Sequence, residues 1–253
     1  MAIAIQGRGL LLASLLLVAC QSDQMGPRAT TMPAAFPSSQ VAQIGSPGAA
    51  ATIVPAVKVE LNGRPVPNVD VTFTVTRGGG AVAKRVVRTD AHGLADCGAW
   101  TLGPELGGTN EVVASIEGAP PVSFSALAFA LPAGAEAYDL VSENGYRLPA
   151  HGFWLGQWEV VAGRLVLSAT STYTATIVEF NSTTREFEVA TYDGPYSRSG
   201  SQLALTNYDG APVATGVFQI DLLAVHVEFD PLLFGSDDTA PPPPQDDVYR
   251  RVI

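Results

Sequence analysis

Apolar and polar residues alternate along short stretches of this chain, and this pattern constrains its fold most strongly. From Val69 to Thr76, valine or phenylalanine at each odd position alternates with aspartate or threonine at each even position. Successive side chains of a β-strand point to opposite faces, so the alternation predicts a half-buried strand. The chain has 25 glycines and 19 prolines, only 15% of its residues are charged, and no long amphipathic helix is evident. We therefore predict an all-β fold.

Further strands of the same kind are predicted between turn signals in the first half. Asn62 and Gly63 mark a turn before the alternating stretch, and three glycines at 78–80 form a loop after it. The additional strands are expected at residues 56–61, 85–89, 94–101, 111–116 and 122–128. This number of strands is typical of a small β-sandwich.

Several segments of this half resemble the bacterial immunoglobulin-like (Big-1) domain of the invasin and intimin type. They are Leu61 to Gly80, Thr89 to Ala95, Trp100 to Gly103, Gly108 to Asn110 and Val122 to Ala126. The resemblance covers roughly residues 44–130. It implies an Ig-like sandwich that acts as a rigid spacer or adhesive module and not as a catalyst.

The second half also reads as short strands joined by tight turns. Turn signals occur at residues 144–145, 181–182, 193–194 and 209–210, which predicts antiparallel neighbours. Strands are expected at 137–142, 158–161, 164–170, 172–180, 185–192, 202–207, 214–220, 223–229 and 248–252. The simplest closure of such strands is an antiparallel up-and-down barrel over residues 136–253, after a linker at 131–135.

Short segments of this half resemble the lipocalin-like C-terminal domains of some bacterial lipoproteins. They are Tyr138 to Pro149, Ser171 to Thr174, Gly194 to Ser197 and Val248 to Arg251. The resemblance implies a lipocalin-like barrel. Four consecutive prolines within residues 235–247 cannot donate ladder hydrogen bonds, so that stretch is predicted to be a loop.

The N-terminus carries an uncharged apolar run from Gly9 to Ala19, which follows Arg8 and stops at Cys20. A membrane-spanning helix needs about 20 residues, so the run is too short to be one. It resembles a bacterial lipoprotein signal with its lipobox. The resemblance implies that residues 1–19 are removed, that Cys20 is acylated, and that the lipid attaches the protein to a membrane.

The residue after the cysteine is Gln21, and in the lipoprotein family this favours the outer membrane, with the side it faces left open. Residues 20–43 are rich in Gln, Ser, Pro, Ala and Thr and have few large apolar groups. Such a segment buries too little surface to offset its ordering entropy, so we predict a flexible tether.

The cysteines and the net charge limit the disulfides and the partners that we expect. Cys97 is the second of two cysteines and lies in a predicted strand, where a buried small apolar role is expected. A disulfide between Cys20 and Cys97 is the alternative.

The formal net charge is −10, and residues 136–253 hold 16 acidic against six basic residues. An acidic surface repels phosphate backbones, so we expect no nucleic-acid partner.

No phosphate-binding loop, zinc-protease helix, Cys-x-x-Cys pair or nucleophile elbow is present in the sequence, so we predict no cofactor and no enzyme. The three histidines are His92, His151 and His226. His92 is explained by turn chemistry, and His226 alternates with apolar residues, which favours a surface position over a buried polar one.

Two groups are candidates for binding. Phe153, Trp154 and Trp158 are candidates to line the mouth of the barrel near His151 and to hold a sugar or an apolar ligand, with core packing as the alternative. Four aspartates flank the proline tract and could coordinate calcium, although a solvated acidic loop explains them as well: Asp237, Asp238, Asp246 and Asp247. We predict no metal site.

The sequence thus predicts a lipid-anchored outer-membrane protein in which an Ig-like spacer presents a β-barrel. The barrel is expected to bind a protein or small-ligand partner without catalysis. One alternative is a periplasmic carrier of a small apolar ligand. Another is a structural scaffold of the envelope whose barrel is filled by its own side chains, and an enzyme that uses His151 and His226 comes third.

Overall fold

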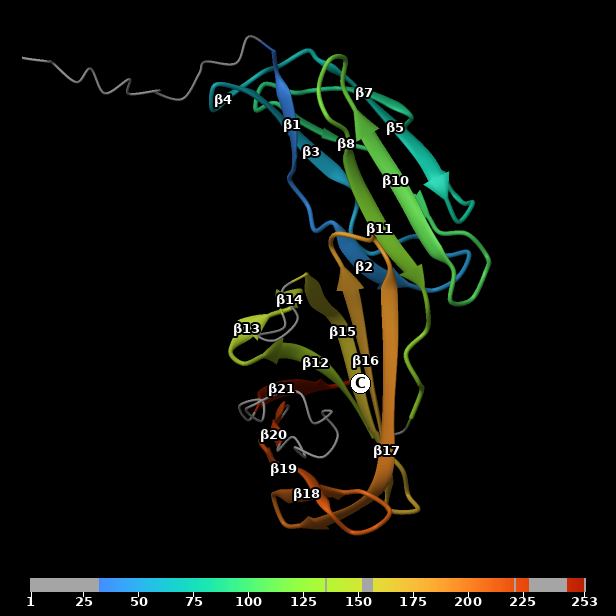
Figure 1. Ribbon diagram of the computed structural model, residues 1–253, viewed down its shortest axis with the longest axis vertical. Helices are drawn as coiled ribbons and strands as arrows, with labels where there is room; N and C mark the ends of the chain where they lie inside the picture. Colours follow the sequence, from blue (N-terminus) through green and yellow to red (C-terminus); the bar gives the residue numbers. More distant parts are fainter. Residues whose placement is uncertain (1–31, 135, 152–156, 221, 228–244, 253) are drawn as a thin grey trace, which may run out of the picture.

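A computed structural model describes residues 32–134, 136–151, 157–220, 222–227 and 245–252. Every regular element within these residues is a β-strand, which confirms the all-β fold class. A sandwich and a barrel lie end to end, and the first described strand starts at the end of the sandwich that is far from the barrel (Figure 1). No helix in the described part is long and apolar enough to span a membrane.

Eleven strands form the sandwich. They are β1 (Ala34–Pro37), β2 (Ala42–Gly45), β3 (Ala56–Leu61), β4 (Arg64–Pro65), β5 (Asp70–Arg77), β6 (Ala81–Val82), β7 (Val86–Arg88), β8 (Leu94–Asp96), β9 (Trp100–Thr101), β10 (Thr109–Ser115) and β11 (Val122–Ala128). One sheet has the order β1-β3-β4, with β8 also beside β3, and the other has the order β2-β11-β10-β5-β7. Strands β6 and β9 form a small pair at the margin.

The predicted alternation decides which side chains fill the sandwich. Val71 and Phe73 of β5 are at most 1% exposed, while Thr72 and Thr74, which follow them in the strand, face solvent. Trp100 is fully buried in the same cluster. Cys97 is also buried there as a free thiol, as expected of a small apolar residue, and burial raises its pKa to about 11.

The prediction of a flexible tether over residues 20–43 is wrong for its last part, which belongs to the sandwich, while residues 20–31 lie outside the described residues. β1 pairs antiparallel with β3, and β2 pairs parallel with β11. Ala35 and Val41 pack on the core, although neither is large. The buried Gln43 amide donates to the Ile53 carbonyl oxygen at 2.7 Å and accepts from the Ile53 N–H at 2.8 Å. These backbone bonds hold a segment whose composition gave no strand signal.

The remaining strands form the barrel and its margin. They are β12 (Ala137–Glu143), β13 (Tyr146–Arg147), β14 (Ala150–His151), β15 (Trp158–Leu167), β16 (Thr172–Asn181), β17 (Phe187–Ser199), β18 (Gln202–Thr206), β19 (Pro212–Phe218), β20 (Leu222–Val227) and β21 (Gln245–Arg251). Neighbours from β15 to β21 pair antiparallel in chain order, and β12 pairs with both β21 and β15. The result is the predicted up-and-down barrel, closed by eight strands.

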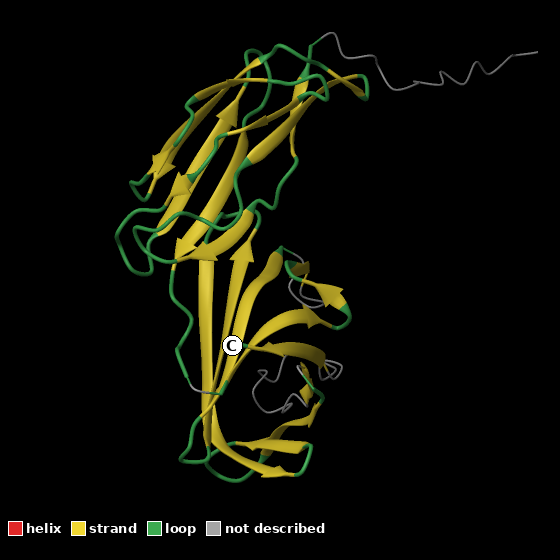
Figure 2. Ribbon diagram, turned by 180° about the vertical axis from the view of Figure 1, so that it is seen from behind, coloured by secondary structure: helices red, strands yellow, loops and turns green. Residues whose placement is uncertain are grey.

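The interior of the closed part is packed with apolar and aromatic side chains from every side of the ring. Leu165, Leu203 and Leu223 are at most 2% exposed, and Tyr138 and Tyr173 are buried with them. Figure 2 shows the molecule from behind, with the strands of the sandwich and the barrel in yellow.

Two predicted interruptions of the barrel strands are wrong. The two strands expected at 158–161 and 164–170 form the single strand β15, and the expected turn at Asp193 and Gly194 lies inside β17. Gly194 pairs with Tyr173 in β16, and a Cβ atom there would lie 2.2 Å from the Thr206 carbonyl oxygen. The glycine therefore serves close approach of two backbones and not a reversal of the chain.

The tip of the β16–β17 hairpin joins the barrel to the sandwich. Arg185 donates from Nη2 to the Ser125 hydroxyl of β11 at 2.9 Å, and its Nε lies 3.9 Å from Glu111 Oε1 of β10. Beside it, Arg77 Nη1 of β5 lies 2.9 Å from Glu186 Oε1. Burial lowers the pKa of Arg185, and Glu111 and Glu159 partly offset this. These contacts fix the barrel against the end of the sandwich (Figure 1).

We expect Phe73→Ala to lower the free energy of unfolding of the sandwich by about 3–5 kcal/mol, because it removes a buried aromatic side chain and leaves a cavity. Urea denaturation followed by Trp100 fluorescence, with Trp154 and Trp158 replaced by phenylalanine, measures this. Val86→Ala is the control, since Val86 is 60% exposed and should cost less than about 0.5 kcal/mol. Equal losses in the two variants would contradict the packing described above.

We expect Arg185→Met, combined with Arg77→Met, to let the sandwich and the barrel reorient separately. Loss of the partly buried Arg185–Ser125 hydrogen bond costs about 1.5–3 kcal/mol. Loss of the half-exposed Arg77–Glu186 ion pair costs about 0–1 kcal/mol, and the methionines keep much of the packing. NMR relaxation measures the rotational correlation time of each half, and the two values should diverge. Arg88→Met is the control, because Arg88 pairs with Asp70 inside the sandwich. Unchanged, equal correlation times in the double variant would show that other contacts hold the junction.

Candidate functional site

The sequence-predicted site residues lie partly outside the described residues, among them Cys20, Phe153 and Trp154. Trp158 begins β15 and is partly buried, and it pairs in register with Asn181 at the start of the hairpin tip. It therefore lies at the end of the barrel that faces the sandwich. The aromatic cluster and the lipid attachment stay predictions.

The three histidines lie on separate elements. The His92 N–H donates to Asp90 Oδ1 at 2.8 Å in a turn of the sandwich. His226 is on the barrel surface, where Nδ1 lies 2.7 Å from Asp246 Oδ1 and its side chain is 42% exposed. His151 belongs to β14 and pairs in register with Glu159. The surface interpretation of His226 agrees with this geometry.

A buried polar group inside the barrel was not predicted. The Tyr249 hydroxyl donates to Asp247 Oδ2 at 3.4 Å, and Glu143 of β12 lies opposite Asp247 in register. All three residues are at most 8% exposed. Burial, together with the charges of Asp247 and Glu143, raises the pKa of Tyr249 well above 10. Tyr249 thus stays protonated and supplies a hydrogen-bond donor to an acidic interior.

The solvated-loop interpretation is wrong for two of the four aspartates flanking the prolines. Asp246 and Asp247 belong to β21, where Asp246 points outward and Asp247 points inward. Asp237 and Asp238 lie outside the described residues. The alternation through Val248 and Tyr249 was a usable signal, but the preceding prolines concealed where the strand began. Among the described residues, no group of three or more His, Cys, Asp or Glu side chains could hold a metal ion.

One part of the barrel wall is open to solvent. Strand β17 has 13 residues, but it pairs with β18 only through Tyr196 to Ser199. Its first half, from Phe187 to Tyr192, pairs with β16 on one side, and no described strand lies on the other. We call this unpaired side the outer edge of β17. Val189 and Tyr192 beside it are 39% and 56% exposed.

Two carboxylates meet beside the outer edge. Glu179 of β16 lies directly opposite Glu188 of β17, on the face that continues the barrel interior through Ile177 and Ala175. Burial, and then the charge of Glu188, raises the pKa of Glu179. Like charges directly opposite on a sheet destabilise it. Tyr192 lies on the same face, and burial and these two carboxylates raise its pKa. The arrangement favours a cation or a basic side chain at this place.

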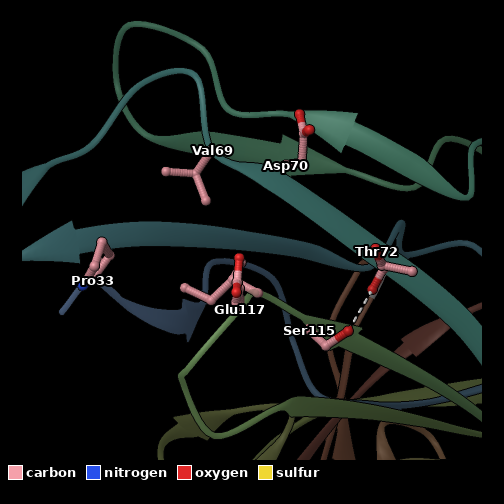
Figure 3. A pocket seen from close by; sticks show the side chains of 7 residues that line it. Pro33, Val69, Asp70, Thr72, Ser115 and Glu117 are labelled. Carbon is pink, nitrogen blue, oxygen red and sulfur yellow. Dashed lines mark hydrogen bonds between the residues drawn. The ribbon is translucent and has the colours of Figure 1, made fainter.

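A separate hollow of about 480 Å³ lies on the sandwich (Figure 3). Its lining residues are Pro33, Val69, Asp70, Thr72, Ser115, Ile116 and Glu117. Asp70 is already paired with Arg88 at 2.9 Å, and the Ser115 hydroxyl donates to the Thr72 carbonyl oxygen at 3.4 Å. The lining residues include two acids, Asp70 and Glu117, and no histidine, cysteine or lysine.

Comparison with known proteins gives little. No protein-family model matches the chain, and no curated protein matches it. One solved structure with a weak likeness is a C-terminal 282-residue fragment of intimin in complex with the intimin-binding domain of the translocated intimin receptor. It is 18% identical, the TM-score is 0.30, and the match spans 63% of this chain and 63% of that one. A likeness of this size supports no statement about function.

We expect Glu188→Gln to lower the pKa of Glu179, because it removes the facing negative charge. The pKa should stay above the usual value, since burial is the larger cause. When folding raises the pKa of a carboxyl group, the free energy of unfolding falls as pH rises from the unfolded-state pKa to the raised folded-state pKa. The variant has a smaller raise, so its free energy of unfolding should fall less between acidic and neutral pH.

Carboxyl NMR titration of Glu179, with urea denaturation at several pH values, measures both effects. Glu186→Gln is the matched control, because Glu186 pairs with Arg77 at the hairpin tip. A pKa of Glu179 that does not change in Glu188→Gln would contradict the facing arrangement.

Proposed function

We propose that the protein is a lipid-anchored, exported binding protein of the bacterial cell envelope. In this proposal Cys20 carries the lipid, the sandwich is a spacer, and the barrel is an adhesion-type interaction module that acts without catalysis. The observation that carries the proposal is the end-to-end arrangement. The chain enters the sandwich at the end far from the barrel, near the β10–β11 turn, where Met32 contacts Gly118.

This arrangement suits a protein that projects from a membrane. Two or more acyl chains anchor a protein stably, whereas one is marginal. A lipid placed before the sandwich would leave the whole sandwich between membrane and barrel. The Arg185 and Glu186 contacts limit swinging of the barrel, so the spacer would present it in a defined direction. Gln21 after the cysteine supports the outer membrane as the site of attachment.

The exposed wall of the barrel supports an interaction surface rather than a carrier. Val189 and Tyr192 of β17 are 39% and 56% exposed and offer contact area to a partner. Leu165, Leu203, Leu223 and Tyr173 are buried within the closed part.

Protease shaving of intact cells tests the proposal, with antibodies against the sandwich and the barrel and a periplasmic protein as the leakage control. We expect both parts to be cut while the control survives. Cys20→Ser should move the protein from the membrane fraction to the soluble fraction, because it removes the acylated thiol. Cys97→Ser is the matched control, since Cys97 is buried in the sandwich.

Cutting only after the outer membrane is opened would exclude adhesion and leave a periplasmic partner for the barrel. A Cys20→Ser protein that stays with the membrane would contradict the lipid anchor. Native mass spectrometry that shows a co-purified small molecule on the chain would favour the carrier instead.

A further inference from the structure

The outer edge of β17 has backbone groups that point away from the barrel. The Asn181 N–H donates to the Glu186 carbonyl oxygen at 2.9 Å, which sets the alternation of the β16–β17 ladder. Counting from this pair, Glu188, Ala190 and Tyr192 exchange backbone hydrogen bonds with β16. The N–H and C=O groups of Phe187, Val189 and Thr191 therefore point to the outer edge, where no described strand lies.

An exposed edge of this kind is a template for another strand. Proteins usually blunt such edges with charged side chains, a proline or a bulge. The stretch from Phe187 to Asp193 has no lysine, proline or bulge, and its pairing with β16 is regular from residue 187 to residue 195. Its charged residues, Glu188 and Asp193, are both acidic, so they disfavour acidic partners and leave the edge open to a basic one. The edge is therefore suited to accept an extended segment by strand addition.

The charges beside the edge decide which segment fits. Glu188 and Asp193 lie in this stretch, Glu179 faces Glu188, and no basic residue lies between Phe187 and Asp193. The N–H and C=O groups of Glu188 bond to β16, so a residue of an antiparallel added strand opposite Glu188 would form a non-hydrogen-bonded pair with it. Side chains lie closer together in such pairs than in hydrogen-bonded pairs. A lysine or arginine there would reach both carboxylates and relieve their repulsion.

A second copy of this chain fits less well. Pairing of β17 with β17 of another molecule would bring two copies of Glu188 and two of Asp193 along one strand pair, without a basic side chain between them. Like charges across an interface suppress the wrong partner.

We propose that the outer edge of β17 binds an extended segment of a partner protein as an added strand. The segment carries lysine or arginine opposite Glu188 and apolar side chains opposite Ala190 and Tyr192. From the N-terminus to the C-terminus of the segment, an antiparallel pairing requires the order apolar, any residue, apolar, any residue, basic. A parallel pairing requires the reverse order. The proposal rests on the barrel being the interaction module and names the chemistry of its partner.

A peptide titration with the full chain carrying Cys20→Ser tests the proposal. The probe is a short blocked peptide in which threonine alternates with valine and lysine, labelled for fluorescence anisotropy. We expect saturable binding and slower hydrogen exchange at the amides of Phe187, Val189 and Thr191. The same peptide with N-methylated backbone amides, and one with glutamate in place of lysine, should not bind.

Two protein variants test the backbone and the charge separately. Thr191→Pro removes an N–H that points to the outer edge, and proline is compatible with an edge strand. It should abolish binding, whereas Thr191→Val keeps the N–H and should bind normally. Glu188→Lys should weaken binding by about tenfold or more, as attraction becomes repulsion. Glu188→Lys decides the test if Thr191→Pro fails to fold by circular dichroism.

Three results would overturn the proposal. The first is slow exchange of the three amides in the free protein, which means that the edge is already covered. The second is binding that survives N-methylation of the peptide or Glu188→Lys. The third is a concentration-dependent dimer with the same amides protected and no peptide present. The shaving experiment depends on the anchor and the whole barrel and not on this edge, so either proposal can fail alone.

Discussion

Closure of the barrel depends on the pairing of β12 with β15, and Arg164 stabilises it. Its Nε donates to Asp139 Oδ1 of β12 and its Nη2 donates to Asp139 Oδ2 at 3.0 Å. Its Nη1 donates to the Pro132 carbonyl oxygen of the linker at 3.1 Å. The Arg164 side chain is 18% exposed and the Asp139 side chain is 42% exposed, so this two-pronged ion pair is partly shielded from water on the arginine side. One side chain thus connects two barrel strands and the segment that leads in from the sandwich.

β12 pairs with β15 only near the end of β15, and this leaves the other end of the long strands outside the ring. Strands β15, β16 and β17 have 10, 10 and 13 residues, whereas β18 has five. The three long strands continue past the ring toward the sandwich. Their far end supplies the hairpin tip that holds the two halves together, and their last strand keeps one edge without a described neighbour. Presentation of the barrel and exposure of its wall therefore come from the same extension.

The accuracy of the sequence predictions followed the strength of local periodicity. The strands at Ala56–Leu61 and Val122–Ala128 have the predicted bounds, because alternation and flanking turn residues agree there. β1 and β2 were missed because their small and polar residues are held by backbone pairing with distant strands. Gly194 was misjudged because a glycine that lets two backbones approach looks, in one dimension, like a glycine that turns the chain.

The sequence by itself determined the fold class, the up-and-down order of the barrel and the burial of residues such as Phe73 and Cys97, because side-chain alternation and turn chemistry are local properties. Only the tertiary structure decided where the ring closes, that Arg185 meets the sandwich, and that Glu179 and Glu188 face each other beside an open edge. Those features depend on register and on unequal strand lengths across the ring. Both are fixed by packing between residues far apart in the chain, which no local pattern encodes.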